Sequence, residues 1–126
     1  GMGSAGNQKA FHPFWDKIQE VSEANFEVEV LSSSLPVWVA FGALWSFPCQ
    51  AMDSLLSDLA HLCMGRARVV WADADANLGL SLWFEVMNLP TLLYFVEGQV
   101  RARIVGMSSK ENILLQIEKI MNFKTE

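Results

Sequence analysis

The sequence predicts a single α/β domain with a central β-sheet of mixed direction. Patterns of buried strands alternate with helix patterns along most of the chain, which is typical of parallel βαβ units. The last third instead contains two strands joined by a tight turn at residues 97–99, followed by an amphipathic helix. A length of 126 residues with 52% hydrophobic residues fits one domain, and it excludes a disordered chain.

The first half of the domain is expected to contain two strands and two helices. Ser22 is a good N-cap for the first helix, and Gly65 is placed to end the second. The β-branched and aromatic run after Pro36 is typical of a strand buried on both faces. The expected elements are a weak strand at 16–21, a helix with Ala24, Phe26, Val30 and Leu31 that ends at 32–34, a strand at 37–41, and a helix at 48–64 whose apolar stripe is Met52, Leu55, Leu56, Leu59, Leu62 and Cys63.

The second half is expected to contain three strands and two helices. Glu97-Gly98-Gln99 has the composition of a hairpin turn, and Ser108 or Ser109 can cap the last helix. The expected elements are a strand at 69–72, a turn at 73–77, a short helix at 80–86, strands at 91–96 and 100–105, and a helix with Ile113, Ile117 and Ile120 on one face. The complete order is βαβαβαββα.

The start of the chain is expected to lie outside this domain. Gly1 precedes a natural-looking start at Met2, and we interpret it as a remnant of cloning. Residues 1–10 form a mobile N-terminal tail in this interpretation, and residues 11–126 form the domain. Phe11, Phe14 and Trp15 are aromatic, which predicts that the tail docks after about residue 10.

Charge and composition exclude several classes of function. A net charge of −5 and a pI near 4.9 oppose nucleic-acid binding, which needs a cationic surface. The longest uncharged apolar stretch, at 35–45, is too short to span a membrane, and no secretory signal is evident. The two cysteines cannot form a disulfide scaffold, which favours a reduced, cytoplasmic protein. No glycine-rich phosphate loop is present, so we expect no cofactor.

A metal site is not predicted. The cysteine and imidazole candidates are His12, His61, Cys49 and Cys63, and no pair of them has zinc spacing. Asp73, Asp75 and Asn77 suggest a calcium loop, but the glycine and the distal glutamate of that motif are missing. We interpret the three residues as a turn and a helix cap.

The element order and five short motifs together resemble the thioredoxin family. Each motif alone is weak, but all of them occur in family order and without gaps between residues 21 and 121. The matches are Trp45-Ser46-Phe47-Pro48-Cys49 for W-C-G-P-C, Leu89-Pro90-Thr91 for I-P-T with its cis proline, Glu97-Gly98-Gln99 for N-G-E, Val105-Gly106 for V-G, and Ser22-Glu23-Ala24-Asn25-Phe26 for T-D-x-x-F. The resemblance implies a thioredoxin fold.

The resemblance also implies that the two-cysteine redox cycle is damaged. The first motif cysteine, the nucleophile, is replaced by Ser46, and only the second, Cys49, remains. A serine hydroxyl cannot carry out disulfide exchange, so we interpret Ser46 as an N-cap that accepts the backbone N–H of Cys49. The family's buried aspartate is matched by Ala40, and the lysine near that aspartate is matched by Trp71.

Two interpretations of Cys49 remain open. It lies on the apolar stripe of its helix, which favours an inert buried thiol. It also lies in the first helical turn beside Pro90, where a partly exposed thiol could form a mixed disulfide. Cys63 lies fourteen residues further along the same helix, about 21 Å away at 1.5 Å per residue. The two cysteines therefore cannot pair within one chain, and Cys63 is expected to be a core thiol.

The resemblance implies an apolar groove around the altered motif. Backbone edges beside a cis proline are suited to pairing with an extended peptide. Phe47, in place of the motif's glycine, adds a large ring beside Trp45, although both rings could instead pack as ordinary structure. The resemblance assigns Gly42, Trp45, Phe47, Pro48, Leu89, Pro90, Gly106 and Met107 to this groove.

Two functional hypotheses follow. The first is a redox-degenerate, thioredoxin-like protein that binds a protein partner or an unfolded client through the groove, in a chaperone-like or assembly role. The second is an enzyme that uses Cys49 as a single thiol in disulfide or glutathione exchange. A purely structural subunit is a third possibility. The sequence names neither the partner nor the oligomeric state.

Overall fold

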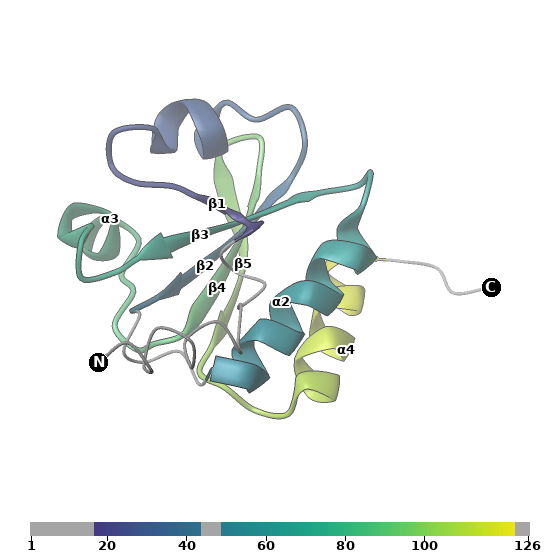
Figure 1. The fold of residues 1–126 in the computed structure, drawn as a ribbon. Coiled ribbons are helices and arrows are strands. Elements are labelled where there is room, and N and C mark those ends of the chain that lie inside the picture. Colours follow the sequence, from purple (N-terminus) through teal and green to yellow (C-terminus); the bar gives the residue numbers. More distant parts are fainter. Residues whose placement is uncertain (1–16, 44–48, 123–126) are drawn as a thin grey trace, which may run out of the picture.

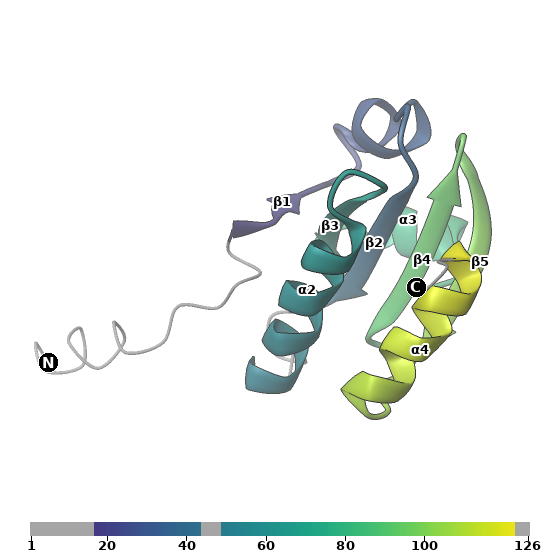
Figure 2. The same ribbon diagram turned by 90° about the vertical axis from the view of Figure 1, so that its right-hand side faces the viewer.

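The computed structural model describes residues 17–43 and 49–122, and these form one mixed sheet between two helical layers (Figures 1 and 2). The predicted α/β class and the order of elements are confirmed. The elements are β1 (Gln19–Glu20), η2 (Glu27–Leu31), β2 (Val37–Gly42), α2 (Cys49–Cys63), β3 (Arg68–Asp73), α3 (Leu78–Trp83), β4 (Thr91–Val96), β5 (Gln99–Val105) and α4 (Lys110–Met121).

The five strands lie in the order β1-β3-β2-β4-β5. Strands β1, β3 and β2 run parallel, whereas β4 is antiparallel to both β2 and β5. The parallel pairs are connected through helices, as crossovers require, and the antiparallel pair β4–β5 is connected by a tight turn. Every residue of the central strand β2 is buried, because helices cover both faces of the sheet.

Helices α2 and α4 cover one face of the sheet. The predicted stripe of α2 is buried against this face, with Leu62 only partly buried, and Ile113 and Ile117 of α4 are also buried. These side chains pack against the sheet residues Trp38, Ala40, Trp71, Leu92, Tyr94 and Ile104.

Helices η2 and α3 cover the opposite face with a smaller contribution. Phe26, Val30 and Leu80 are the buried side chains of this layer, and they pack against Val37, Val39, Phe41, Val70, Ala72, Leu93 and Phe95 of the sheet. The Phe26, Phe84 and Phe95 rings form a cluster with centroids 5.2–5.5 Å apart. Contacts between aromatic rings therefore contribute to the packing of this layer.

Two helices differ from their predicted bounds. The first was expected to begin just after Ser22, but a turn occupies residues 23–25 and the following segment, η2, is a π-helix in which the Ser32 N–H donates to the Glu27 carbonyl at 2.8 Å. Ser22 still caps the turn, since its Oγ accepts the Ala24 N–H. Helix α3 begins two residues earlier than predicted, and it ends three residues earlier because Glu85 has a φ of 56°.

The predicted ends of three other elements agree with the structure. Gly65, which follows α2, has a φ of 79°, a left-handed conformation that favours glycine. Gly98 has a φ of 80°, and a Cβ there would lie 2.9 Å from the Leu31 carbonyl oxygen. Ser109 is the N-cap of α4, and its Oγ accepts the Asn112 N–H at 3.1 Å.

Candidate functional site

Four strand ends meet at one edge of the sheet. The Gly42 carbonyl, at the end of β2, accepts the Ala74 N–H at 2.7 Å, which joins it to the end of β3. Pro90 precedes β4, and its carbonyl accepts the N–H of Gly106, just after β5, at 2.8 Å. Gly42, Pro90 and Gly106 are thereby held at the same edge of the sheet.

The turn before β4 contains a cis peptide bond and is stabilised by hydrogen bonds to backbone carbonyls. The Leu89–Pro90 peptide bond is cis. The Thr91 hydroxyl, which is buried, donates to the Asn88 carbonyl at 2.6 Å. The Arg103 guanidinium donates to the carbonyls of Phe84 and Glu85 at 2.6 and 3.2 Å and so fixes the segment that enters the turn.

The predicted groove residues are only partly described. Gly42 and Pro90 are buried, whereas Leu89, Gly106 and Met107 are partly exposed. Met107 packs against the core beneath α2 and α4, and Leu89 packs against the core on the other face. Trp45, Ser46, Phe47 and Pro48 lie outside the described residues, and so does the predicted N-cap role of Ser46.

The two cysteines lie at opposite ends of α2. Cys49 is the first residue of this helix and Cys63 the last, so fourteen residues of helix separate their backbones by about 21 Å. A disulfide requires Cα atoms within about 7 Å of each other. The prediction that they cannot pair within one chain is therefore confirmed.

Cys63 is an inert thiol, as the sequence predicts. Its side chain is fully buried, and the thiol donates to Met121 Sδ, with the two sulfur atoms 3.7 Å apart. Burial raises the pKa of Cys63 to about 11, although the positive charge of Arg66 acts in the opposite direction. The reactive thiolate is therefore scarce at neutral pH.

Ala40 and Trp71 are neighbours in the sheet. They are register partners in the parallel pair β2–β3, and Leu92 is the partner of Ala40 on its other side. Ala40 is fully buried and Trp71 nearly so, in the core covered by α2 and α4. The described side chains of this cluster, with the exception of the Tyr94 phenol and the Cys63 thiol, carry no titratable group that could accept a proton.

The Asp73–Asn77 segment is a turn, but one predicted detail is wrong. Asp73 Oδ1 accepts the N–H groups of Asp75 and Ala76, as expected of a turn. Asn77 occupies the N-cap position of α3, yet its side chain does not cap the helix. Its Oδ1 instead accepts the Glu23 N–H at 2.9 Å, and its Nδ2 donates to the Asp73 carbonyl.

The described residues contain no group of three or more histidine, cysteine, aspartate or glutamate side chains that could hold a metal ion. Within the same ranges, 17–43 and 49–122, no helix is long and apolar enough to cross a membrane.

Sequence reasoning missed the residues that join distant segments. Arg103 and Asn77 act through backbone groups far away along the chain, and Glu23 Oε2 accepts the Gly79 N–H at 2.6 Å. Only Asn77 carried a signal, because its type and position indicated a turn. Its contact with Glu23 could not be seen in the sequence.

The sheet order, the two helical layers and the turn before β4 define a protein of the thioredoxin-fold class. The thioredoxin family model matches residues 17–119, and the chain belongs to this family.

Similar proteins include the thioredoxin of Mycobacterium bovis, which is 34% identical over 81% of this chain and 88% of its own length. The thioredoxin of Staphylococcus saprophyticus is 35% identical over 81% of this chain and 96% of its own length. A bifunctional thioredoxin reductase/thioredoxin of Mycobacterium leprae is also 34% identical over 81% of the chain, which spans about a fifth (22%) of that longer protein.

Proposed function

We propose that this thioredoxin-family protein binds an extended segment of a partner or client protein at the edge formed by Gly42, Leu89–Pro90 and Gly106–Met107, without running a two-cysteine redox cycle. The observation that carries the proposal is the position of the two cysteines at opposite ends of α2. A dithiol cycle oxidises two thiols to one disulfide, and these two thiols cannot meet within one chain.

The surroundings of the motif support the same proposal. Ala40 stands where the resemblance places the aspartate that manages the proton of the second cysteine, and its strand neighbours Trp71 and Leu92 are apolar. Binding of an extended chain needs none of these groups, because backbone hydrogen bonds and apolar pockets supply affinity and specificity. Leu89 and Met107 offer partly exposed apolar surface at this edge.

The first experiment measures capture of a probe, reduced and carboxymethylated α-lactalbumin, by fluorescence anisotropy. We expect Phe47→Ser to weaken capture while the melting temperature changes little, because under this proposal the ring contributes to binding and not to the core. The matched control is Leu115→Ser, which changes a leucine on α4 that is 56% exposed. If Phe47→Ser unfolds the protein but affinity of the remaining folded fraction is unchanged, Phe47 is a core residue and the proposal fails.

The second candidate is a single-thiol exchange enzyme that uses Cys49. The relatives are named thioredoxins, which favours disulfide exchange, and Cys49 is the first residue of α2. In this reaction the Cys49 thiolate would attack a disulfide, form a mixed disulfide and release the other thiol, and a second thiol such as glutathione would regenerate Cys49. Cys49→Ser separates the two candidates, because it leaves capture intact under the binding proposal and abolishes insulin-disulfide reduction under the exchange proposal.

Repair of the motif tests why the redox cycle is absent. Ser46→Cys restores two cysteines at the family spacing, and we expect the internal disulfide to form. Reductase activity should stay low, since a positioned base contributes about 10²–10⁴ in rate and Ala40 supplies none. Adding Ala40→Asp should recover part of this activity, provided that the buried carboxylate does not unfold the protein. Full activity from Ser46→Cys alone would show that Ala40 and Trp71 are unimportant.

We also propose a cytoplasmic location, because a chain with only two cysteines is typical of a reducing compartment. We propose that the domain extends over residues 11–126.

A further inference from the structure

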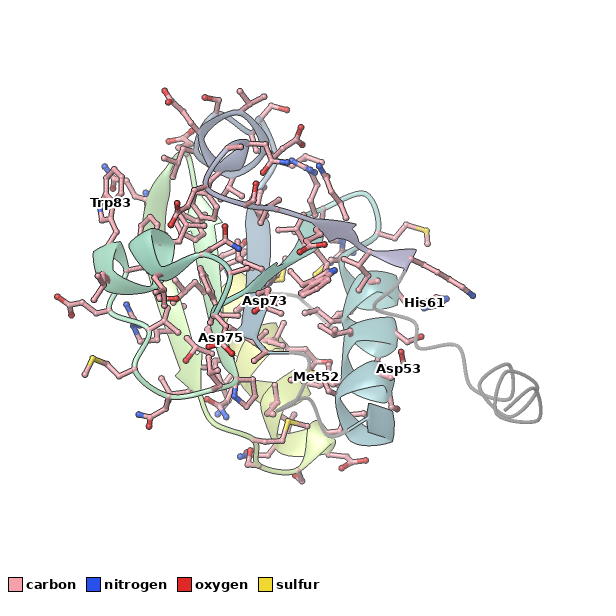
Figure 3. All side chains as sticks on the ribbon, turned by 60° about the vertical axis from the view of Figure 1, so that its left-hand side comes forward. Met52, Asp53, His61, Asp73, Asp75 and Trp83 are labelled. Carbon is pink, nitrogen blue, oxygen red and sulfur yellow. The ribbon has the colours of Figure 1, made fainter. Side chains whose placement is uncertain are left out.

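Helix α3 exposes more apolar surface than it buries. Four of its six residues are large and apolar, and only Leu80 is buried. Leu78, Leu82 and Trp83 are 64%, 80% and 74% exposed. Figure 3 shows the Trp83 ring directed away from the sheet. Apolar side chains gathered in this way on a surface are typical of a protein-binding site.

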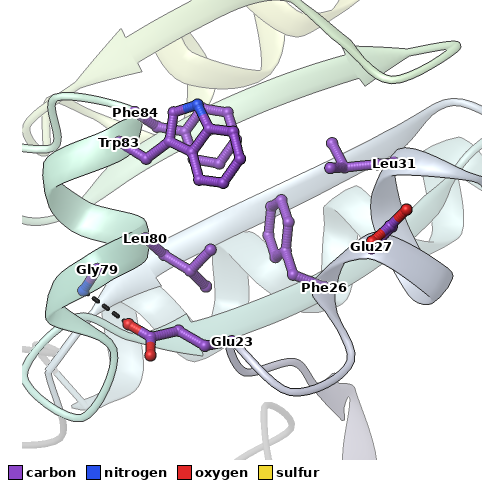
Figure 4. Close-up of a pocket in the computed structure, with 8 residues that line it drawn as sticks. All are labelled: Glu23, Phe26, Glu27, Leu31, Gly79, Leu80, Trp83 and Phe84. Atoms are coloured by element: carbon purple, nitrogen blue, oxygen red, sulfur yellow. Dashed lines mark hydrogen bonds between the residues drawn. The ribbon is translucent and has the colours of Figure 1, made fainter.

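A hollow of about 310 Å³ lies beside this helix, between α3 and the segment that contains η2 (Figure 4). Phe26, Leu80 and Phe84 form apolar walls, and Trp83 stands at the rim. The Trp83 indole is stacked on the Phe84 ring, with centroids 5.7 Å apart and planes at 6°. One indole face is therefore covered by Phe84, and the high exposure of Trp83 leaves the other open.

The charged side chains that line the hollow are both carboxylates. Glu23 and Glu27 are its only charged residues, and no basic residue lines it among the described residues. Glu23 Oε2 accepts the Gly79 N–H at 2.6 Å, which leaves Oε1 available. The Glu27 carboxylate makes no hydrogen bond or ion pair with any described residue.

We propose that this hollow binds an arginine side chain from a partner protein. The apolar residues that precede and follow this arginine in the partner contact Leu78 and Leu82 of α3. A guanidinium stacks on an aromatic face and also pairs with carboxylates, and the hollow offers a tryptophan face together with two carboxylates. Tryptophan is the best aromatic partner for a cation. The net charge of −5 adds long-range attraction for a basic partner.

Arginine fits this site better than the other occupants do. Lysine has no planar group to stack on Trp83. A purely apolar group would leave the Glu27 carboxylate beside it without a partner, and Glu23 with only the Gly79 N–H. A free arginine molecule would not use the exposed leucines of α3. This site lies on the face of the sheet opposite α2 and α4, so the inference goes beyond the proposed function and can fail independently of it.

The test follows backbone and indole N–H signals of the full chain by NMR during titration with the peptide acetyl-Leu-Arg-Leu-amide. We expect shifts confined to residues 23–31 and 78–85, with a dissociation constant of about 0.1–1 mM. Replacing arginine by citrulline, a neutral group of the same shape, should abolish these shifts. Raising the salt concentration should weaken binding, because part of the attraction is between exposed charges.

Paired variants assign the contacts. Trp83→Ala should weaken binding by about 3- to 30-fold, the range expected for a cation–π contact. Its control, Leu115→Ala on α4, should leave binding unchanged. Glu27→Gln should weaken binding by about 2- to 5-fold, in line with an exposed ion pair, and the control Glu111→Gln should not. Phe47→Ser should also leave this binding unchanged.

Several outcomes would overturn the inference. Equal binding of the citrulline peptide would show that charge plays no part, and equal binding of free arginine amide would exclude a protein segment as the occupant. Shifts at residues 88–91 and 105–107 instead would place the peptide at the other site. A dimer of the unliganded protein that dissociates on Trp83→Lys, measured by sedimentation, would assign the surface to self-association.

Discussion

The two faces of the sheet are covered in different ways. On one face, α2 and α4 contain 15 and 12 residues, and they turn their apolar stripes toward the sheet. On the other face, η2 and α3 contain five and six residues, and α3 turns most of its apolar side chains toward solvent. The long helices therefore supply most of the apolar burial, whereas the exposed residues of α3 contribute little to folding and remain available for binding.

The largest expected effect on stability comes from a pair of variants that replaces one leucine on each face. Leu56→Ala in α2 removes a fully buried side chain and should lower the free energy of unfolding by about 3 kcal/mol. Leu82→Ala in α3 removes a side chain that is 80% exposed and should change it by less than about 0.5 kcal/mol. Urea denaturation measures both. Similar losses for the two variants would contradict the contrast between the faces.

The buried thiol of Cys63 predicts a loss of stability at high pH. Its pKa is raised from 9.0 to about 11 by burial, so above pH 9 the unfolded chain loses a proton that the folded chain retains. The free energy of unfolding should therefore fall between pH 9 and 11, by about 2 to 3 kcal/mol in total.

Cys63→Ala provides the comparison, measured as urea midpoints at pH 7 to 11. The variant should lose stability at pH 7 but show a smaller decline at high pH. Some decline should remain, because burial raises the pKa of Tyr94 and this effect persists in the variant, whereas the smaller effect of the negative Cys63 thiolate is lost. An unchanged slope between pH 9 and 11 would show that Cys63 is accessible to water.

Replacement of Asn77 tests whether the stability of the layer formed by η2 and α3 depends on polar contacts. Asn77→Ala should cost about 2 kcal/mol, because it leaves the Glu23 N–H and the Asp73 carbonyl without their buried partner. Hydrogen exchange should accelerate in residues 22–31 and 74–83 more than in α2. Equal acceleration across both faces would mean that the two layers unfold as one unit.

The smallest expected effect concerns Arg103 and its neighbour Arg101 on β5. Arg103→Met removes two hydrogen bonds to the carbonyls of Phe84 and Glu85 and should cost about 1 kcal/mol. Arg101→Met changes an exposed residue of the same strand and should have almost no effect. Thermal unfolding distinguishes the two variants. If both lose the same stability, the loss comes from the charge of the strand and not from the link to α3.

Local patterns were sufficient to predict most of the fold. The strand at 91–96, the turn with Gly98 and the cap of α4 depend on residues that are neighbours in the sequence. The strand and the turn were predicted correctly, and Ser109 is one of the two caps that were predicted for α4. The bounds of α3 were missed. The helix ends at Trp83, because Glu85, just after it, has a left-handed conformation that a non-glycine residue seldom adopts.

The candidate site could be predicted only in part. Motifs located Pro90 and Gly106, and the structure places them at one edge of the sheet. The roles of Asn77 and Arg103 could not be predicted, because their partners lie 54 and 19 residues away and only the folded chain brings them together. The hollow beside Trp83 likewise depends on the packing of η2 against α3.

The two outer strands of the sheet have a consequence for aggregation. Exposed strand edges can pair with other molecules, and short or charged edges reduce this tendency. The outer strand β1 has only two residues, so it offers little backbone for such pairing. The opposite outer strand, β5, carries Arg101 and Arg103, whose repulsion opposes the approach of an identical strand. The protein can thus expose apolar surface on α3 while both outer strands of its sheet resist fibril growth.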